Sequence, residues 1–273
     1  MQGMVPLSGF GGVPYSAVRK AAPRNLLDNS DFTNPVNQRG KTSYSNPGYS
    51  IDRWKITNNY SSMTVDDDGV TFSANGGMCY PQQLIVANAN MVGKTFTAAI
   101  CLKDGSVTVT SGVLTALSPA SNTLIGNRAA ITNGNGAELA MYARTDGNLM
   151  IQPHIPDGVS LGLRWAALYE GEYTAETLPE YHPKGYGAEL AECQRYYVAS
   201  DGYFYLNSNP DGVSRVSFYV PNMRVIPTVS FLVESADNAV VNVQMIAKNA
   251  ITFWSTANNG FIRVLAIELS ADL

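Results

Sequence analysis

The sequence has few charged side chains and no long apolar segment. Both features restrict the classes of function that it can have. Charged residues make up 15% of the 273 residues, and the formal net charge is −4. The 18 lysines and arginines are scattered rather than gathered into the basic stripe that a nucleic-acid-binding protein needs. No apolar run approaches the roughly 18 residues that span a bilayer. We therefore expect neither nucleic acid as a partner nor insertion into a membrane.

Cysteine and histidine are also scarce. The three cysteines, Cys79, Cys101 and Cys193, are odd in number and widely spaced, which fits neither a disulfide framework nor a zinc motif. We expect free and mostly buried thiols, which suit synthesis in a reducing cytoplasm. The two histidines, His154 and His182, are too few for a histidine–metal cluster. The sequence therefore predicts no metal site and no cofactor.

Patterns that carry catalysis are weak. The short Gly185-Tyr186-Gly187 run lacks the third glycine of a nucleotide-binding loop. Acids such as Glu170 and Glu172 are neighbours only in sequence, whereas glycoside cleavage needs two acids placed across a cleft. We expect these acids at the surface near a hinge, and we predict that the chain is not an enzyme.

What the sequence does contain is a series of short β patterns separated by turns. Over residues 25–178, alternating or apolar runs recur between dipeptides such as Asp-Gly and Asn-Gly, a cadence typical of a β-sandwich. Residues 179–187 include Pro179 and Pro183, so we interpret them as a hinge. A helical turn and a second set of strands follow over residues 188–273. The sequence therefore predicts an all-β chain with a large sandwich followed by a smaller C-terminal β-sandwich domain.

Residues 1–24 differ from both domains because they show no sustained period. They have the composition of neither a strand nor a solvated tail, and a frayed terminus is one interpretation. Apolar side chains, at Met4, Leu7, Phe10 and Tyr15 among others, are too frequent for a disordered tail. We therefore favour an extended N-terminal arm that docks on a neighbouring subunit or a larger particle.

Two tryptophans lie in segments with a strand pattern. Trp54 falls within residues 51–57 and Trp165 within residues 161–170. In the second segment, strict alternation places Leu163 and Trp165 on the same face. We expect both tryptophans to be core residues.

Four motifs carry a resemblance to a known family. The opening Asn-Leu-Leu-Asp-Asn-Ser-Asp-Phe at residues 25–32, followed by Asp-Arg-Trp at 52–54, resembles the start of jelly-roll carbohydrate-binding modules. Extended through Asn-Pro-Val-Asn-Gln-Arg-Gly at 34–40, the opening is also similar to the first domain of prophage tail proteins. The runs Glu-Leu-x-x-Cys-Gln-Arg-Tyr-Tyr at 189–197 and Phe-x-Val-Pro-x-Met-Arg-x-x-Pro-Thr-Val at 218–229 resemble tail-fibre and receptor-binding proteins of bacteriophages.

The resemblance implies a structural protein of a bacterial virus or prophage, a tail fibre or receptor-binding protein that attaches to host-surface glycans without cleaving them. Such a protein is made in the bacterial host cytoplasm, belongs to the virion, contacts other virion proteins through its arm and is usually a homotrimer. A head fibre or capsid decoration protein is an alternative of the same class. A secreted carbohydrate-binding module or glycan-active enzyme is an alternative from another class.

The resemblance also implies a jelly-roll topology for the first sandwich. Jelly-roll sugar-binding modules often hold a structural calcium ion, and Asp66-Asp67-Asp68-Gly69 is the cluster of carboxylates that suggests one here. Its spacing does not fit an EF-hand, and a solvated hairpin turn is the better interpretation.

A sugar site combines aromatic rings that stack on a pyranose with amides that bind its hydroxyls. The chain has 15 tyrosines, but tyrosine also fills cores and subunit interfaces. Arg53 and Arg195 precede aromatic residues within the motifs, and we interpret both as structural hydrogen-bond donors. The candidate ligand-binding residues are Tyr44, Tyr49 and Tyr60 in the first domain and Tyr203, Tyr205 and Trp254 in the second.

Overall fold

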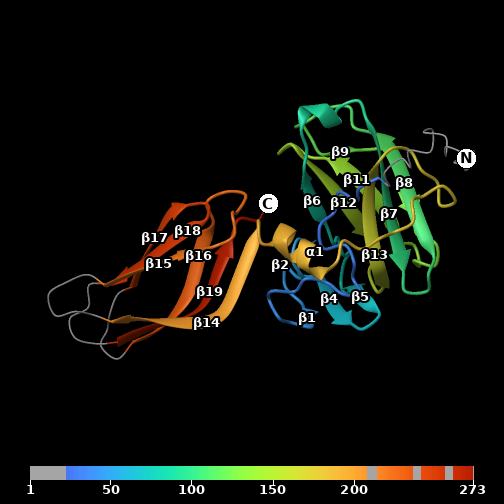
Figure 1. Cartoon of the computed structure of the whole chain (residues 1–273). Coiled ribbons are helices and arrows are strands. Elements are labelled where there is room, and N and C mark those ends of the chain that lie inside the picture. The colour runs from blue at the N-terminus through green and yellow to red at the C-terminus, as the bar shows by residue number, and fades with distance from the viewer. Residues whose placement is uncertain (1–22, 208–213, 236–240, 256–260, 273) are drawn as a thin grey trace, which may run out of the picture.

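The chain folds as two β-sandwiches with one α-helix between them (Figure 1). The computed structural model describes residues 23–207, 214–235, 241–255 and 261–272. Strands dominate these residues, which confirms the prediction of an all-β, sandwich-type fold. Within the described ranges, no helix is both long enough and apolar enough to cross a membrane.

The first sandwich packs a six-stranded sheet against a five-stranded sheet, and neighbouring strands are antiparallel. A short pair, β2 (Gly48–Tyr49) and β3 (Lys55–Ile56), and a 3-10 turn at Ala89–Met91 lie outside these sheets. In spatial order the larger sheet contains β1 (Ser43–Tyr44), β4 (Ser61–Asp66), β5 (Gly69–Ala74), β13 (Ser160–Glu170), β7 (Thr95–Leu102) and β8 (Val107–Val113). The smaller contains β10 (Ala129–Ala130), β11 (Glu138–Ala143), β12 (Asn148–His154) and β6 (Gln83–Val86), with β9 (Thr123–Leu124) also paired to β11.

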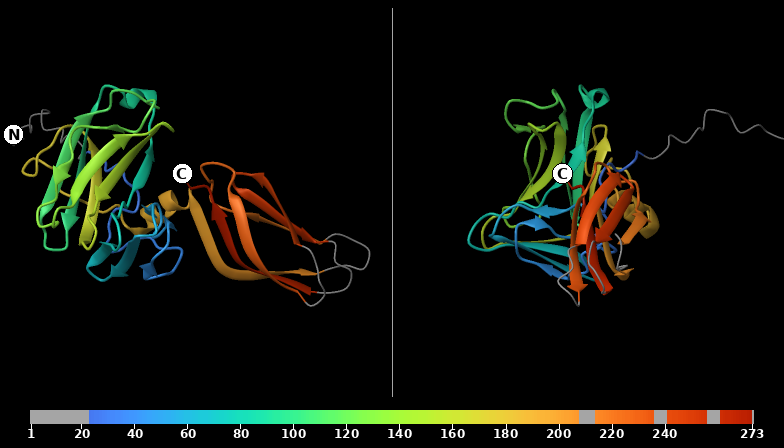
Figure 2. Two further views of the ribbon diagram at one scale, coloured as in Figure 1. Left: turned by 180° about the vertical axis from the view of Figure 1, so that it is seen from behind. Right: turned by 90° about the vertical axis from the view of Figure 1, so that its left-hand side faces the viewer.

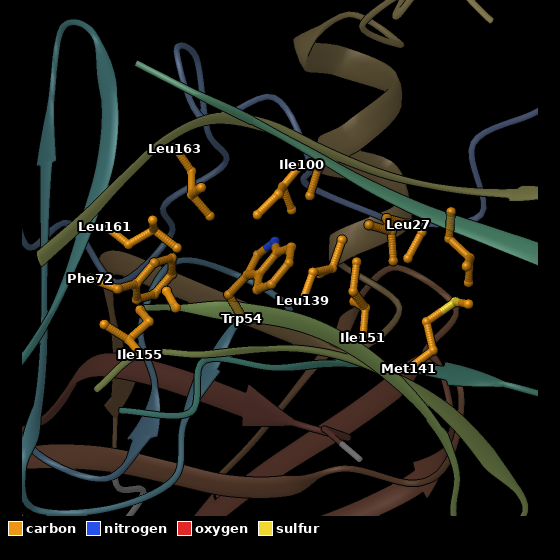
Figure 3. Close-up of a cluster of buried hydrophobic side chains, with 14 of the residues drawn as sticks. Leu27, Trp54, Phe72, Ile100, Leu139, Met141, Ile151, Ile155, Leu161 and Leu163 are labelled. Atoms are coloured by element: carbon orange, nitrogen blue, oxygen red, sulfur yellow. The ribbon is translucent and has the colours of Figure 1, made fainter. Parts of the chain in front are cut away.

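Strand alternation builds the apolar core between these two sheets, as Figure 3 shows. Trp54 lies in this core with no exposed surface, and its ring centroid is 5.1 Å from that of Phe32 and 6.4 Å from that of Phe72. The indole Nε1–H donates to the Asn29 carbonyl oxygen at 2.9 Å, so burial leaves no polar group of this ring unpaired. The prediction that Trp54 is a core residue is confirmed.

The segment around Trp54 is a turn rather than the expected strand over residues 51–57. Arg53 has a φ of +69°, which is incompatible with extended structure. Trp54 N–H donates to the Ile51 carbonyl at 3.1 Å, closing the turn. Only Lys55–Ile56 of this segment forms a strand, so the expected strand boundaries are wrong.

A β-bulge on β13 separates two residues that strict alternation places on one face. The register of β13 against β7 shifts between Leu163 and Trp165. Leu163 therefore faces the main core, whereas Trp165 is half-buried on the opposite face and stacks on Tyr181 at 4.7 Å. The expectation that Trp165 shares a face with Leu163 is wrong, because the extra residue of the bulge reverses the pattern.

The second sandwich consists of two three-stranded sheets. The rings of Phe204, Phe218 and Phe253 meet between them, with centroids 4.7 to 6.3 Å apart. One sheet contains β14 (Tyr197–Asn207), β19 (Phe261–Ser270) and β16 (Thr228–Ser235). The other contains β15 (Ser214–Tyr219), β18 (Ala250–Ser255) and β17 (Val241–Ala247).

Helix α1 (Tyr186–Cys193) lies between the sandwiches in the left-hand view of Figure 2 and is anchored to the first of them. Its buried Glu189 carboxylate accepts a hydrogen bond from the backbone N–H of Asn29. The Asn29 side-chain amide in turn donates to the carbonyls of Val36 at 2.8 Å and Asp52 at 2.7 Å. One asparagine therefore joins the start of the domain, the loop that follows it and the helix.

The cysteines are free and buried, as predicted. Burial raises the pKa of Cys79 to about 11 and also raises the pKa of Cys193, so neither is a thiolate at neutral pH. Cys193 has no exposed surface at the end of α1, where it acts as a small apolar side chain.

A partly buried arginine joins the two sandwiches. Arg39 pairs through Nη1 with Asp52 at 2.9 Å and through Nη2 with Asp272 at 3.1 Å. Its guanidinium carbon lies 3.7 Å from the centre of the Tyr197 ring. The Gln38 side-chain amide donates to the Tyr197 carbonyl at 2.8 Å and to Asp52 at 3.0 Å. Because Asp52 belongs to the first sandwich and Asp272 follows the last strand of the second, this cluster fixes their relative position.

We expect Arg39→Ala to destabilise the protein by about 3 kcal/mol, because it leaves two carboxylates with little solvent access and no cation between them. Urea unfolding followed by tryptophan fluorescence measures the change. Arg128→Ala is the matched control, since it removes an exposed pair with Glu138 and should cost less than about 1 kcal/mol. Equal effects of the two variants would contradict the role given to Arg39.

Candidate functional site

The outer face of the five-stranded sheet carries an open groove of about 450 Å³. On β12, Leu149 and Ile151 point into the core, so Met150 and Gln152 point the other way and form part of the groove. The complete lining is Lys55, Thr57, Tyr80, Gln82, Asn122, Arg144, Met150 and Gln152. Most of these side chains end in an amide, a hydroxyl or a cation.

Two glutamines form the polar floor of the groove. The Gln152 amide Nε2 donates to Gln82 Oε1 at 3.0 Å, and the register of β12 on β6 places Gln152 beside Gln82, the residue immediately before β6. The backbone of Gln82 exchanges hydrogen bonds of 2.9 and 3.0 Å with Lys55, which brings β3 to the same place. One end of each amide is thereby fixed, while the other end faces the groove without a protein partner among the described residues.

Aromatic side chains border this floor. Tyr80 is half-buried, and its ring meets the His154 ring edge to face with centroids 5.0 Å apart. Tyr142 stacks on His154 with ring centroids 6.0 Å apart, and its hydroxyl lies 3.2 Å from His154 Nε2. Arg128 donates to the Tyr142 hydroxyl at 3.2 Å. His154 therefore contacts both tyrosine rings.

His154 stays neutral at physiological pH. Burial is the main cause that lowers its pKa to about 4, and the nearby Arg128 cation lowers it further. A neutral imidazole with this pKa is a poor general acid or base near pH 7. Its role in the geometry is to hold Tyr80 and Tyr142 in place.

The lining of the groove includes two cations and no carboxylate. Arg144 donates through Nε to Asp146 at 3.0 Å, which orients its side chain. Lys55 lies with its Nζ 5.6 Å from the centre of the Tyr49 ring. Amides, a tyrosine edge and two cations suit a hydroxyl-rich ligand bound by hydrogen bonds and stacking.

The candidate tyrosines of the first domain lie in three different environments. Tyr44 is only 8% exposed and its hydroxyl donates to Asn37 at 2.5 Å, so its ring faces are covered. Tyr49 lies under Arg39 and Lys55, which places it beside the groove. Tyr60 is 52% exposed, away from the groove lining. Of these three, only Tyr49 is close to the groove.

The candidates of the second domain lie on the outer faces of opposite sheets. Tyr203 and Tyr205 project from β14 with ring centroids 5.6 Å apart, and the Arg263 guanidinium lies 4.2 Å from the Tyr203 ring centre. Trp254 belongs to β18, where its neighbour Phe253 points into the core and Trp254 therefore points outward. The six residues do not form one site.

Sequence reasoning missed the residues that line the groove, above all Tyr80, Gln82 and Gln152. The strand patterns near residues 83–86 and 149–152 were visible in the sequence. Their pairing was not, and only the pairing brings the two glutamines together. Polar residues at alternate positions of β12 were the available signal.

Other features of the sequence have simpler surroundings. The Asp66 carboxylate is bound by Lys103 Nζ at 2.6 Å, and no group of three or more His, Cys, Asp or Glu side chains in the described part of the chain could hold a metal ion. Residues 158–162 match Gly-x-Ser-x-Gly in letters, but Ser160 begins a strand and shares a 2.7 Å hydrogen bond with Ser73. The predicted arm residues, Met4, Leu7, Phe10 and Tyr15, lie outside the described residues.

We expect the His154 imidazole to titrate near pH 4 in an NMR titration of the folded protein. Because the unfolded chain takes up this proton near pH 6.5, this histidine lowers the free energy of unfolding as the pH falls from 6.5 towards 4. His154→Gln assigns the resonance, since the chain has only two histidines. A midpoint above pH 6 would show that the ring is not held in the buried, neutral state.

Comparison with known proteins gives no ligand or role for the groove, so its function is inferred from its own residues. No protein-family model matches the chain, and neither a curated protein nor a solved structure matches it.

Proposed function

We propose that the chain is a structural protein of a bacterial virus or prophage, a tail-fibre or receptor-binding protein that attaches to host-surface glycans without cleaving them. The groove beside Tyr80 and Gln152 is the observation that carries the glycan part of this proposal. The motifs at residues 25–40, 52–54 and 189–197 carry the viral part. On this proposal the protein belongs to the virion and reaches other virion proteins through residues 1–24.

The chemistry of the groove supports a saccharide as the ligand. A fixed pair of amides offers both a donor and an acceptor, which is what vicinal hydroxyl groups need. Tyr80 adds an aromatic surface at the border of the groove. The groove is open and shallow, which suits a chain of sugars better than a small enclosed metabolite.

Binding without cleavage agrees with the charges of the lining. Glycoside hydrolysis uses two carboxyl groups across the scissile bond, and the lining of this groove has none. The carboxylate of Asp146, which lies outside the lining, is bound by the lining residue Arg144 at 2.9 Å. We therefore propose an attachment site that holds its ligand and releases it unchanged.

We expect the purified protein to bind glycans on an array of bacterial surface polysaccharides, and Tyr80→Ala and Gln152→Ala to weaken binding of the strongest hit about three- to tenfold. Isothermal titration measures the loss. Tyr219→Ala is the matched control, because it removes an exposed tyrosine of the second sandwich that lies outside the proposed subunit contact. Loss of binding in Tyr219→Ala with none in Tyr80→Ala would move the site to the second sandwich, and no glycan binding at all would reject the attachment function.

We also propose that the protein is a homotrimer, with the outer face of the β14–β19–β16 sheet in the contact. Tyr203, Leu265 and Leu232 lie opposite one another across the three strands of this face. Tyr203 is 56% exposed and Leu232 is 63% exposed, which is unusual for side chains that form a continuous apolar row. A second copy of the chain would cover them.

Light scattering of the full chain is expected to give the mass of three chains, and Leu232→Glu to give that of one. The glutamate would place a charge in the apolar contact while leaving the core of the sandwich unchanged, because Leu232 is exposed in the single chain. Tyr219→Glu is the control, since Tyr219 is 90% exposed on the other sheet. A single-chain mass for the unaltered protein would reject the trimer.

A further inference from the structure

A second cavity, of about 530 Å³, lies where the two sandwiches meet. Its walls come from the start of the first sandwich, from β6 and the turn that follows it, and from the segments that precede β14 and β16. The lining is Arg24, Leu26, Asp28, Arg53, Ile85, Val86, Asn88, Met91, Arg195, Tyr196 and Arg224. It does not share a lining residue with the groove described above.

Positive charge dominates this cavity. Four of the lining residues are arginines, and Asp28 is the one acid among them. Asp28 is already paired with Arg53 at 3.2 Å, and Arg24 is paired with Glu192 at 2.7 Å. The two arginines contributed by the second sandwich are therefore left without an acid.

Arg195 and Arg224 are those two residues. Neither has a carboxylate partner among the described residues, and the nearest acceptor of Arg224 is the Ala271 carbonyl at 3.4 Å. The expectation that Arg195 is a structural hydrogen-bond donor is wrong for its side chain, which is exposed and makes no hydrogen bond in the described structure. Its position at the cavity is better explained by a ligand than by the fold.

Arg53 supplies the second, independent observation. It is only 3% exposed, it lies 3.5 Å above the Tyr196 ring, and its Nη2 donates to the Leu84 carbonyl at 2.7 Å. Its Nη1, like Nε of Arg224, is buried and has no acceptor in the described structure. A buried guanidinium nitrogen without an acceptor is unfavourable, and the cavity is where an acceptor could be supplied.

We propose that this cavity binds a small molecule that carries an oxoanion group, a carboxylate, sulfate or phosphate. Arginine recognises such groups because its planar fork of N–H donors matches two oxygens at once. Arg195 and Arg224 supply the free donors, and Arg53 forms the rigid floor. The site therefore takes an anion and is distinct from the glycan groove, which lacks this cluster of arginines.

The apolar residues of the lining restrict the chemical class of the ligand. Leu26, Ile85 and Met91 line the cavity together with the arginines, so we infer that the bound molecule has a carbon skeleton as well as an anionic group. The volume fits a single ring such as that of an acidic monosaccharide. The chain as a whole carries a net charge of −4, so general attraction does not explain anion binding, and the effect has to be local.

Isothermal titration of the full chain with glucuronate, inorganic phosphate and inorganic sulfate tests the proposal, with glucose as the neutral comparison. We expect at least one anion to bind at physiological ionic strength, and Arg195→Gln and Arg224→Gln each to weaken it about tenfold. Tighter binding of glucuronate than of phosphate or sulfate supports an organic acid, and tighter binding of phosphate or sulfate would contradict the inferred carbon skeleton. Binding of glucose as strong as that of glucuronate would overturn the assignment of an anion site.

Two further variants separate a specific site from a general charge effect. Arg215→Gln removes an exposed arginine from the second sandwich, far from the cavity lining, and is expected to leave binding unchanged. Val86→Glu adds an acid at a half-exposed position of the lining and is expected to abolish binding while the fold persists. An equal loss in Arg215→Gln, full binding in Val86→Glu, or no anion bound below about 10 mM would each overturn the proposal.

Discussion

The architecture depends on a guanidinium group placed between two carboxylates where the sandwiches meet. Arg39 satisfies Asp52 from the first sandwich and Asp272 from the end of the second, and Tyr197 covers its face. Carboxylates with so little solvent access are unfavourable without a partner, so the cluster favours the arrangement of the two domains in which both are paired. The adjoining Asn29 network adds the helix to the same arrangement.

Strand β6 connects the two surfaces that we assign to ligands. Gln82, immediately before it, lies in the groove, whereas Ile85 and Val86 at its other end line the arginine-rich cavity between the sandwiches. Over this short strand the surrounding polar groups change from the amides of the groove to the arginines of the cavity. The groove is built by the first sandwich alone, while the cavity needs Arg195 and Arg224 from the second. The cavity therefore exists only when the domains are held as the Arg39 cluster holds them.

The sequence predicted the broad fold because strand periodicity and turn dipeptides are local signals. Trp54 is a core residue as expected, although the strand pattern from which this was expected is a turn in the structure. Trp165 was misplaced because a bulge of one residue reverses a face, and no local pattern marks it. The groove was missed because Gln82 and Gln152 are 70 residues apart and meet only through strand pairing. Arg195 was misjudged because its neighbours in space, not in sequence, determine whether it has a partner.

The members of the Arg39 cluster lie far apart in the sequence, and this affects the order in which they become available during synthesis. Arg39 and Asp272 are 233 residues apart. At the usual speed of a ribosome, roughly 10 to 50 seconds pass between the translation of the two. Strand β13 ends at Glu170, so the first sandwich has all its strands well before Asp272 is made. During that interval Arg39 has only Asp52 as an acid partner, because Asp272 has not yet been translated.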